Sequence, residues 1–310
     1  MTTPFDGSRT LWYTLPASVP DATAEALVAR IKATAPNVTG LLVKAWNWDY
    51  WALRAVAKKP RAVASIADLR YWVDLLHANG LKCYAWGVAR GERISREITL
   101  MQQIASAGVD AMVADVEVGE FYWQGTAAGA TAIARAIADT GVHLGICFDY
   151  RGAHAIHSNA VQWMPYAGSL HPMAYHWHFQ RSASSVMTEM ARILAPRRLP
   201  IVPALQGYSL RGRPYLASDI PITARIALAQ PGVVGVSWFR IGQGLALGSE
   251  DGIGPADLRV IGLVDPAMPQ EPALFAYTDR AGVTVDVLAI EGGKWRTRSG
   301  VIAPIPLKAA

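Results

Sequence analysis

The chain has few cysteines, few charged residues and no long apolar run, and each shortage excludes a class of protein. Its two cysteines, Cys83 and Cys147, allow neither a disulfide framework nor a cysteine-rich zinc site. Both fall in apolar strand-like runs, so we expect two buried free thiols. No apolar run approaches the roughly 20 residues that cross a membrane, so we predict no membrane partner.

Motifs that bind common cofactors are also missing. No G-x-G-x-x-G follows the first strand-like run and no G-x-x-x-x-G-K-[ST] occurs, so dinucleotide and P-loop phosphate sites are not indicated. The histidines do not follow a metal-ligand pattern: His77 and His143 fall on positions typical of structural roles, whereas His176 and His178 are better candidates for a substrate site. We therefore expect no cofactor and no metal.

The formal net charge of +5 comes from basic residues that are scattered along the chain. This distribution does not predict a nucleic-acid partner, and it suits a mild preference for an anionic surface such as a bacterial cell wall. The segment 1–9 is polar and lacks the apolar core of a signal peptide, so the chain is expected to be cytoplasmic as synthesised. Action outside the cell would require release by lysis or carriage on a phage-like particle.

A hydrophobic fraction of 52% and a charged fraction of 17% indicate a globular chain with a large core. Eight short apolar runs alternate with segments of helical period, which predicts βαβ units and a parallel sheet. The predicted strands are 11–15, 40–46, 82–88, 111–116, 144–149, 169–176, 201–207 and 233–240. The predicted helices are 22–35, 65–78, 96–107, 125–140, 182–194 and 220–228. Eight units in about 240 residues favour an α/β fold of the closed (β/α)8 TIM-barrel type.

The pattern changes after Arg240. Residues 241–272 are rich in Gly and Pro and predict a long loop with a short helix near 255–259. Residues 273–302 alternate between apolar runs and turn signals, which predicts a three-stranded antiparallel β-meander. We therefore expect a TIM-barrel domain over 1–267 and a small β appendage over 268–310 that packs on the barrel or docks to a protein partner.

Active sites of such barrels lie at the C-terminal ends of the strands, where this sequence places carboxylates, aromatic rings and amides. Aromatic faces and hydrogen-bonding side chains suit a sugar, which has apolar C–H faces and a belt of hydroxyls. The predicted substrate-binding residues are Trp46, Trp86, Gln206, Tyr208, Trp238 and His176.

Asp115 and Glu117 close the predicted strand 111–116. At positions i and i+2 their side chains point to one face, here the barrel interior near its mouth. Two carboxyl groups this close raise each other's proton affinity, so one can stay protonated as a general acid while the other stays ionised. Glycosidic bond cleavage requires such a pair. Asp149, at the end of the next strand, is the best candidate for a further catalytic carboxylate.

The segment Asp110-Ala111-Met112-Val113-Ala114-Asp115-Val116-Glu117 resembles the strand-four signature D-G-x-D-x-D-x-E of family 18 glycoside hydrolases, the chitinase-like group. Ala111 and Val113 replace the Gly and the middle Asp of that signature. Met173-Ala174-Tyr175 resembles the family's M-x-Y-D, with His176 in place of the Asp, and Trp238 falls where the family has a Trp.

This resemblance implies specific roles. Glu117 would be the general acid, Asp115 and Tyr175 would hold the substrate's N-acetyl group as it acts as nucleophile, and Trp238 would form the floor of the sugar pocket. The Asp-Val-Glu tripeptide also resembles the strand-four D-x-E of family 25 lysozymes, although the strand 11–15 lacks the Asp that this family carries there.

The leading hypothesis is thus a glycoside hydrolase acting on an N-acetylated polysaccharide, either peptidoglycan or a chitin-like glycan, as a cell-wall lysin. A second hypothesis is a non-catalytic TIM barrel that binds glycan or serves as a structural module, which the changes at Val113 and His176 favour. A third is a barrel enzyme such as an aldolase, with Lys44 as a Schiff-base lysine.

Overall fold

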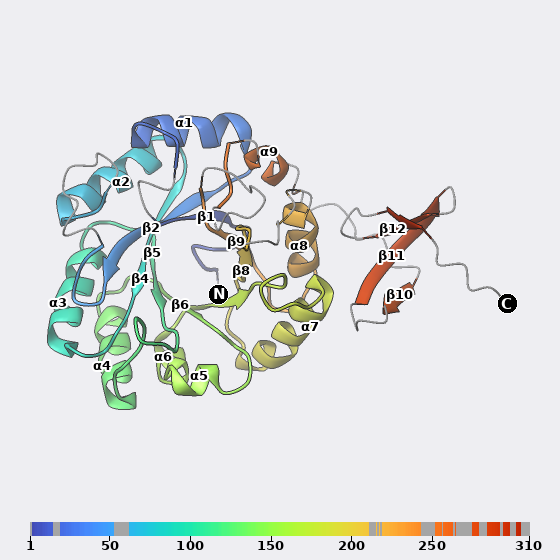
Figure 1. The fold of residues 1–310 in the computed structure, drawn as a ribbon. Helices are drawn as coiled ribbons and strands as arrows, with labels where there is room; N and C mark the ends of the chain where they lie inside the picture. Colours follow the sequence, from blue (N-terminus) through green and yellow to red (C-terminus); the bar gives the residue numbers. More distant parts are fainter. Residues whose placement is uncertain are drawn as a thin grey trace.

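The chain forms a closed barrel of parallel strands surrounded by helices (Figure 1). The computed structural model describes residues 2–14, 19–52, 62–210, 215, 217, 219–242, 252–255, 257–262 and 264, and the backbone of the C-terminal strands. The strand order is β1-β9-β8-β7-β6-β5-β4-β2, and β1 pairs with β2 to close the ring. The predicted (β/α)8 TIM-barrel fold is confirmed.

All eight barrel strands lie where the apolar runs predict them. They are β1 (Arg9–Tyr13), β2 (Gly40–Asn47), β4 (Lys82–Val88), β5 (Ala111–Asp115), β6 (Leu144–Phe148), β7 (Ser169–Ala174), β8 (Ala204–Gln206) and β9 (Val236–Phe239). The short strand β3 (Tyr50–Trp51) was not predicted; it folds back antiparallel on the end of β2. The fourth strand of the barrel is therefore β5.

The six predicted helices are also present. They are α1 (Ala24–Thr34), α2 (Ile66–Ala78), α3 (Ile94–Ala105), α4 (Ala127–Ala138), α7 (Ala183–Leu194) and α8 (Asp219–Leu228). Side-chain oxygens cap several of them; Ser65, for example, accepts from the backbone N–H of Asp68 at the start of α2. Among the described residues, no helix is long and apolar enough to cross a membrane.

Three short helices complete the described part of the barrel. Two of them, α5 (His154–His157) and α6 (Ala160–Trp163), follow β6 and were not predicted, because a four-residue helix leaves little periodicity to read. The third, α9 (Leu258–Ile261), lies close to the short helix expected near 255–259.

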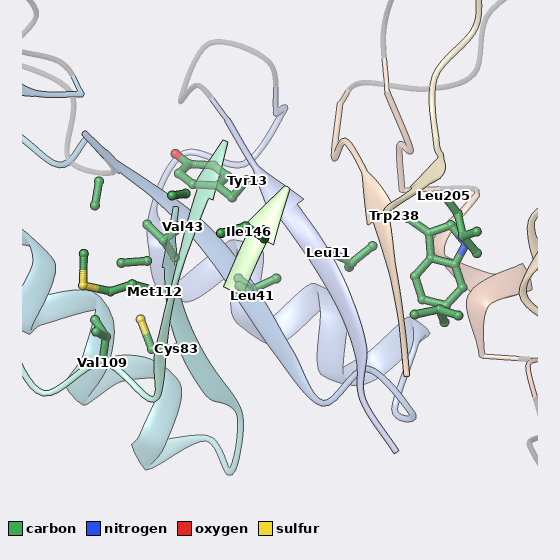
Figure 2. Packing of buried hydrophobic residues seen from close by; sticks show 14 of the residues in the cluster. Leu11, Tyr13, Leu41, Val43, Cys83, Val109, Met112, Ile146, Leu205 and Trp238 are labelled. Carbon is green, nitrogen blue, oxygen red and sulfur yellow. The ribbon is translucent and has the colours of Figure 1, made fainter. Parts of the chain in front are cut away.

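Alternation along each strand sends side chains to two separate cores. Outward-facing residues such as Leu11, Leu41, Met112 and Ile146 fill the layer between the sheet and the helices (Figure 2). Inward-facing residues fill the barrel itself; they include Trp12, Leu42, Tyr84, Trp86, Val113 and Met173. A residue's position in this alternation thus decides whether it can reach a site inside the barrel.

An aromatic plug closes the N-terminal end of the barrel. The ring of Phe5 stacks on Tyr84 at 4.4 Å between centroids and meets the edge of His171 at 4.6 Å. The Tyr84 hydroxyl donates to the carbonyl of Pro4 at 2.8 Å, which fixes the N-terminal segment beneath the barrel. Burial lowers the pKa of His171 to about 3, so its ring is neutral.

Asp110, the first residue of the strand-four signature, belongs to this N-terminal end and not to the mouth. It accepts from Lys82 Nζ and from the backbone N–H of Cys83, each at 2.8 Å, and lies 2.8 Å from His77 Nε2. Burial opposes its ionisation, but the hydrogen bonds outweigh burial and hold the pKa of Asp110 below its usual value. Its role is to join α2, β4 and β5.

The C-terminal segment forms a second, antiparallel sheet. Its order is β10 (Phe275–Thr278), β11 (Thr284–Glu291), β12 (Lys294–Thr297) and β13 (Ile302–Pro304). The predicted meander is present with one more strand than expected. The additional strand, β13, was missed because it is only three residues long. Figure 1 shows β10–β12 outside the ring of helices. The domain boundary at 267/268 falls outside the described residues and stays a prediction, as does a partner for the meander.

We predict that Asp110→Asn destabilises the barrel without changing its mouth. The expected loss in the free energy of unfolding is about 1.5–3 kcal/mol near neutral pH, the range for hydrogen bonds to charged groups. Because folding lowers the pKa of Asp110, its stabilisation is present above the unfolded value of 3.8 and is lost as pH falls through the folded value.

Urea unfolding at about pH 7 and about pH 3 measures this loss. Asp74→Asn, at an exposed position of α2, is the matched control. An equal loss at both pH values would contradict the ionic role of Asp110.

Candidate active site

A cavity of about 420 Å³ opens at the C-terminal ends of the barrel strands. Its walls combine carboxyl groups, basic groups and aromatic rings. The lining residues are Trp12, Thr14, Lys44, Trp86, Val88, Asp115, Glu117, Tyr122, Cys147, Asp149, Arg151, Met173, Tyr175, His178, Phe179, Tyr208, Phe239 and Arg240. The volume suits one or two sugar rings, and the mixed lining is typical of small-molecule sites.

Asp115 and Glu117 come together in this cavity as their spacing predicts. Asp115 is the last residue of β5 and faces inward two positions after Val113, and Glu117 follows from the loop. The two carboxyl groups lie close enough to shift each other's pKa. Asp115 is only 6% exposed, and its Oδ1 has no hydrogen-bond partner among the described residues. A buried acceptor is thus left for a donor that enters the cavity.

Burial controls the protonation of this pair. It raises the pKa of both carboxyls, while the Lys44 ammonium lowers that of Asp115. The negative charges of Asp115 and Asp149 raise the pKa of Glu117 further. Since the two groups cannot both ionise at low cost, the pair holds one proton at neutral pH, and these influences place it on Glu117.

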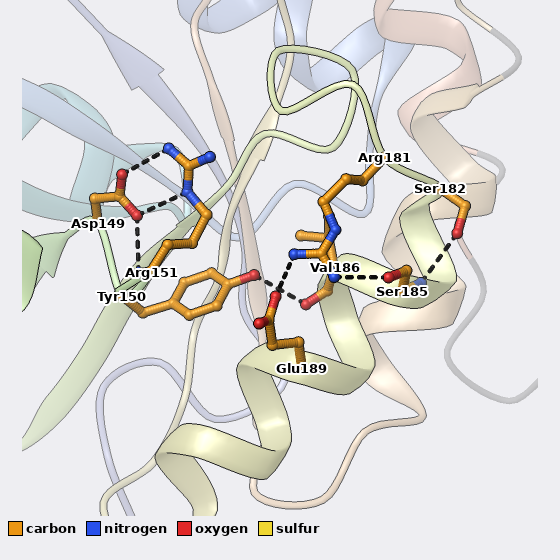
Figure 3. A network of polar contacts seen from close by, with 8 residues as sticks. All are labelled: Asp149, Tyr150, Arg151, Arg181, Ser182, Ser185, Val186 and Glu189. Carbon is orange, nitrogen blue, oxygen red and sulfur yellow. Dashed lines mark hydrogen bonds and ion pairs between the residues drawn. The ribbon is translucent and has the colours of Figure 1, made fainter. Parts of the chain in front are cut away.

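Asp149 lies in the cavity but is held by its neighbour. Figure 3 shows the Arg151 guanidinium facing the carboxylate, with Nε donating to Oδ1 at 3.0 Å and Nη2 donating to Oδ2 at 2.7 Å. The intervening Tyr150 points the opposite way and donates to the carbonyl of Val186 on α7 at 3.1 Å. Asp149 is therefore a fixed negative charge beside Glu117, with both oxygens occupied.

Aromatic rings form the rest of the wall. The rings of Trp12 and Trp86 meet edge to face with 4.9 Å between their centroids, and Phe239 packs against both. Phe239 also contacts Tyr175 and Tyr208, whose rings meet edge to face at 5.6 Å between centroids. The structure thus places three predicted residues, Trp86, Tyr175 and Tyr208, in the cavity wall.

Trp46 does not reach the cavity, contrary to its prediction as a substrate-binding residue. A bulge in the pairing of β2 with β4 follows Lys44, so that Trp46 lies opposite Gly87 on the outer face. Trp46 is fully buried there, and the absence of a side chain at Gly87 leaves room for its ring. Simple alternation from Lys44 would have turned Trp46 inward.

Trp238 is also an outward-facing core residue and cannot form a pocket floor. It pairs in register with Leu11 on β1 and Leu205 on β8, and Figure 2 shows it packed beside Leu205. Its neighbour Phe239 takes the inward position. The resemblance to family 18 thus pointed to a strand that does line the cavity, but the lining residue of that strand is Phe239 and not Trp238.

His176 and Gln206 support the wall without lining it. His176 packs against Tyr215, with 5.7 Å between the ring centroids. Burial lowers the pKa of His176 to about 4. Gln206 is fully buried; its Oε1 accepts from the His178 backbone N–H at 2.9 Å and its Nε2 donates to the Tyr208 carbonyl at 2.8 Å. Neither His176 nor Gln206 lines the cavity, although both were predicted to contact substrate, and Gln206 instead positions two lining residues.

Several lining residues were missed by sequence reasoning. Tyr122 lies in the loop after β5, and a hydrogen bond from its hydroxyl lowers the pKa of Glu117. The sequence signal was the aromatic triplet 121–123, but nothing in it distinguishes the residue that points inward. Trp12 and Phe239 could have been found from the strand alternation of β1 and β9. Within the described ranges, no group of three or more His, Cys, Asp or Glu side chains could hold a metal ion.

No protein-family model matches the sequence, and no curated protein matches it at a significant level. The fold of the chain is, however, similar to that of several solved structures. A GH113 β-1,4-mannanase superposes with a TM-score of 0.59 at 9% identity, over 84% of this chain and 98% of that one. A fungal β-1,4-galactanase superposes with a TM-score of 0.56 at 11% identity, over 83% of this chain and 99% of the galactanase. The GH18 chitinase ChiB of Flavobacterium johnsoniae superposes with a TM-score of 0.52 at 12% identity, over 84% of this chain and 94% of the chitinase.

These likenesses define the class: the chain has the TIM-barrel fold that these glycoside hydrolases share. At such identities they establish the fold alone and do not single out one family. The activity has to be argued from the cavity.

We predict that Glu117→Gln stabilises the ligand-free protein in alkaline solution. Folding raises the pKa of Glu117 above its usual 4.5, so between the unfolded and folded values the folded state binds a proton that the unfolded chain has released. Stability therefore falls as pH rises through that window. Removing the group should add about 1–3 kcal/mol to the free energy of unfolding at about pH 8 and little at about pH 4.

Urea unfolding at these two pH values measures the effect. Glu120→Gln changes an exposed carboxylate of the same loop and serves as the control. A Glu117→Gln protein that gains no stability relative to this control would show that Glu117 is not held protonated.

Proposed function

We propose that this protein is a glycoside hydrolase that cleaves an N-acetylated polysaccharide, with Glu117 as the general acid. The observation that carries the proposal is the carboxyl pair formed by the buried Asp115 and the half-buried Glu117 at the mouth of an aromatic-lined barrel cavity. A protonated carboxyl group can donate to the glycosidic oxygen at neutral pH. The rings of Trp86, Tyr175 and Tyr208 offer faces and edges for a sugar.

The spacing of the carboxyl groups favours a substrate-assisted reaction. A protein nucleophile lies about 5–5.5 Å from the acid, and an inverting base about 6.5–9.5 Å. Asp115 and Glu117 stand two positions apart at the end of one strand and shift each other's pKa, so we place them on the same side of the scissile bond. Asp149 is a poor nucleophile because Arg151 occupies both of its oxygens. The nucleophile is then the carbonyl oxygen of the substrate's own N-acetyl group.

In this reaction Glu117 transfers its proton to the leaving oxygen as the N-acetyl oxygen bonds to the anomeric carbon. The unpartnered Oδ1 of Asp115 accepts the N–H of the same acetamido group and balances its developing positive charge. Tyr175, in the cavity wall, orients the group. Water then attacks the anomeric carbon, returns a proton to Glu117 and restores the acetamido group.

A cell-wall substrate fits the charge of the chain. The net charge of +5 favours binding to an anionic polymer surface, so peptidoglycan is the preferred substrate over a neutral chitin-like glycan. A lysin set free by lysis, or carried on a phage-like particle, would meet that substrate.

A binding-only role is the second candidate, and one observation favours it. Val113 lies fully buried beneath Asp115, at the signature position where a third carboxylate would stand. In that case the wild-type protein would bind glycan and release no product.

We predict that Glu117→Gln lowers the rate of glycan cleavage by about 10²–10⁴-fold, the usual contribution of a general acid. The assay measures reducing ends released from purified peptidoglycan and from chitin oligomers. Glu120→Gln should retain the wild-type rate, since it changes an exposed carboxylate three residues away. Equal cleavage by wild type and Glu117→Gln would remove Glu117 as the acid, and binding without any cleavage would favour the second candidate.

A further inference from the structure

Lys44 is a cationic group of the cavity that has no contact with the substrate in the proposed reaction. It lies on β2 and faces into the barrel, with its side chain half-buried. Its Nζ lies 4.8 Å from the centre of the Trp86 ring. Among the described residues, it has neither a hydrogen bond nor an ion pair within 4.0 Å, so its N–H donors face the cavity.

One of the two arginines that line the cavity, Arg151, is already paired. Its guanidinium is paired with Asp149 through two hydrogen bonds and lies 3.4 Å from the centre of the Phe179 ring. A ligand would have to break a bidentate ion pair to bind there, whereas the Lys44 ammonium can be approached without any such loss.

The surroundings of Lys44 favour an incoming anion. Burial lowers the pKa of Lys44, and the negative charge of Asp115 acts in the opposite direction from beyond ion-pair distance. An anion that contacts Nζ would remove the cost of leaving an ammonium desolvated. It would also strengthen the hold of Glu117 on its proton, since a further negative charge in the cavity disfavours ionisation of the carboxyl pair.

We propose that Lys44 binds a carboxylate carried by the sugar ring, so that the substrate is an acidic glycan. This inference rests on the proposed glycosidase function and narrows its substrate class. Trp86, directly beneath the ammonium, contacts the apolar face of the ring, while the carboxylate at the ring's edge reaches Nζ. Two sources carry this chemistry: the lactyl ether of the acidic sugar in peptidoglycan, and the carboxyl group of a uronic acid.

Binding to an inactive protein tests the proposal separately from cleavage. Glu117→Gln protein is titrated calorimetrically with three probes of equal length: a neutral N-acetylglucosamine oligomer, a peptide-free peptidoglycan fragment with free lactyl carboxylates, and an oligouronate. We expect at least one acidic probe to bind about tenfold or more tightly than the neutral one. The acidic probe that binds more tightly identifies the source of the carboxylate.

Two further variants in the same background assign the preference to Lys44. Lys44→Met should bring the ratio of acidic to neutral affinity to about one, and Lys44→Arg, which keeps the charge, should retain the preference. Far-ultraviolet circular dichroism and urea midpoints check that both variants fold. If Lys44→Met does not fold, Lys44→Gln replaces it.

The outcomes separate the inference from the function. Equal affinity for acidic and neutral probes, or a preference that survives Lys44→Met, would overturn the role of Lys44 while leaving cleavage of neutral glycans possible. Failure of all three probes to bind would overturn the glycan site itself, and the inference with it.

Discussion

The arrangement of this cavity depends on two neighbouring carboxyl groups at the end of β5, the buried Asp115 and the half-buried Glu117. Removing Asp115 and Glu117 from water makes a double negative charge costly, so the pair retains a proton that isolated carboxylates would release. The basic groups nearby are placed accordingly: Lys44 favours ionisation of Asp115, and Arg151 neutralises Asp149. The proposed chemistry follows from this division of charge between adjacent groups.

The two ends of the barrel differ: the N-terminal end is filled, and the C-terminal end contains the cavity. At the N-terminal end, Phe5 and Tyr84 fill the interior, and Asp110 is fully engaged in binding β4 and α2. At the C-terminal end, inward-facing side chains leave an open cavity, and Oδ1 of Asp115 has no hydrogen-bond partner there among the described residues. Asp110, directly before β5, thus joins structural elements, whereas Asp115, five positions later at the end of β5, lines the cavity.

Sequence alone predicted the barrel because eight β-branched and aromatic runs alternate with amphipathic helices, a pattern that few folds share. It also placed Asp115 and Glu117 together, since strand alternation is a local rule. It failed where the rule is interrupted. A bulge after Lys44 turns Trp46 outward. His176 and Trp238 failed for a different reason: they follow the alternation, which turns them away from the cavity beside the inward-facing Tyr175 and Phe239. The orientation of Tyr122 depends on how its loop folds, which no periodicity encodes.

The most direct test of the account is the titration of the Glu117 carboxyl carbon, followed by nuclear magnetic resonance in the ligand-free protein and assigned with the Glu117→Gln variant. The account predicts that the Asp115–Glu117 pair titrates in two steps, with the second proton leaving above neutral pH and reported mainly by Glu117. Release of both protons near the ordinary glutamate value of about 4.3 would contradict it, because neither carboxyl could then serve as an acid at neutral pH.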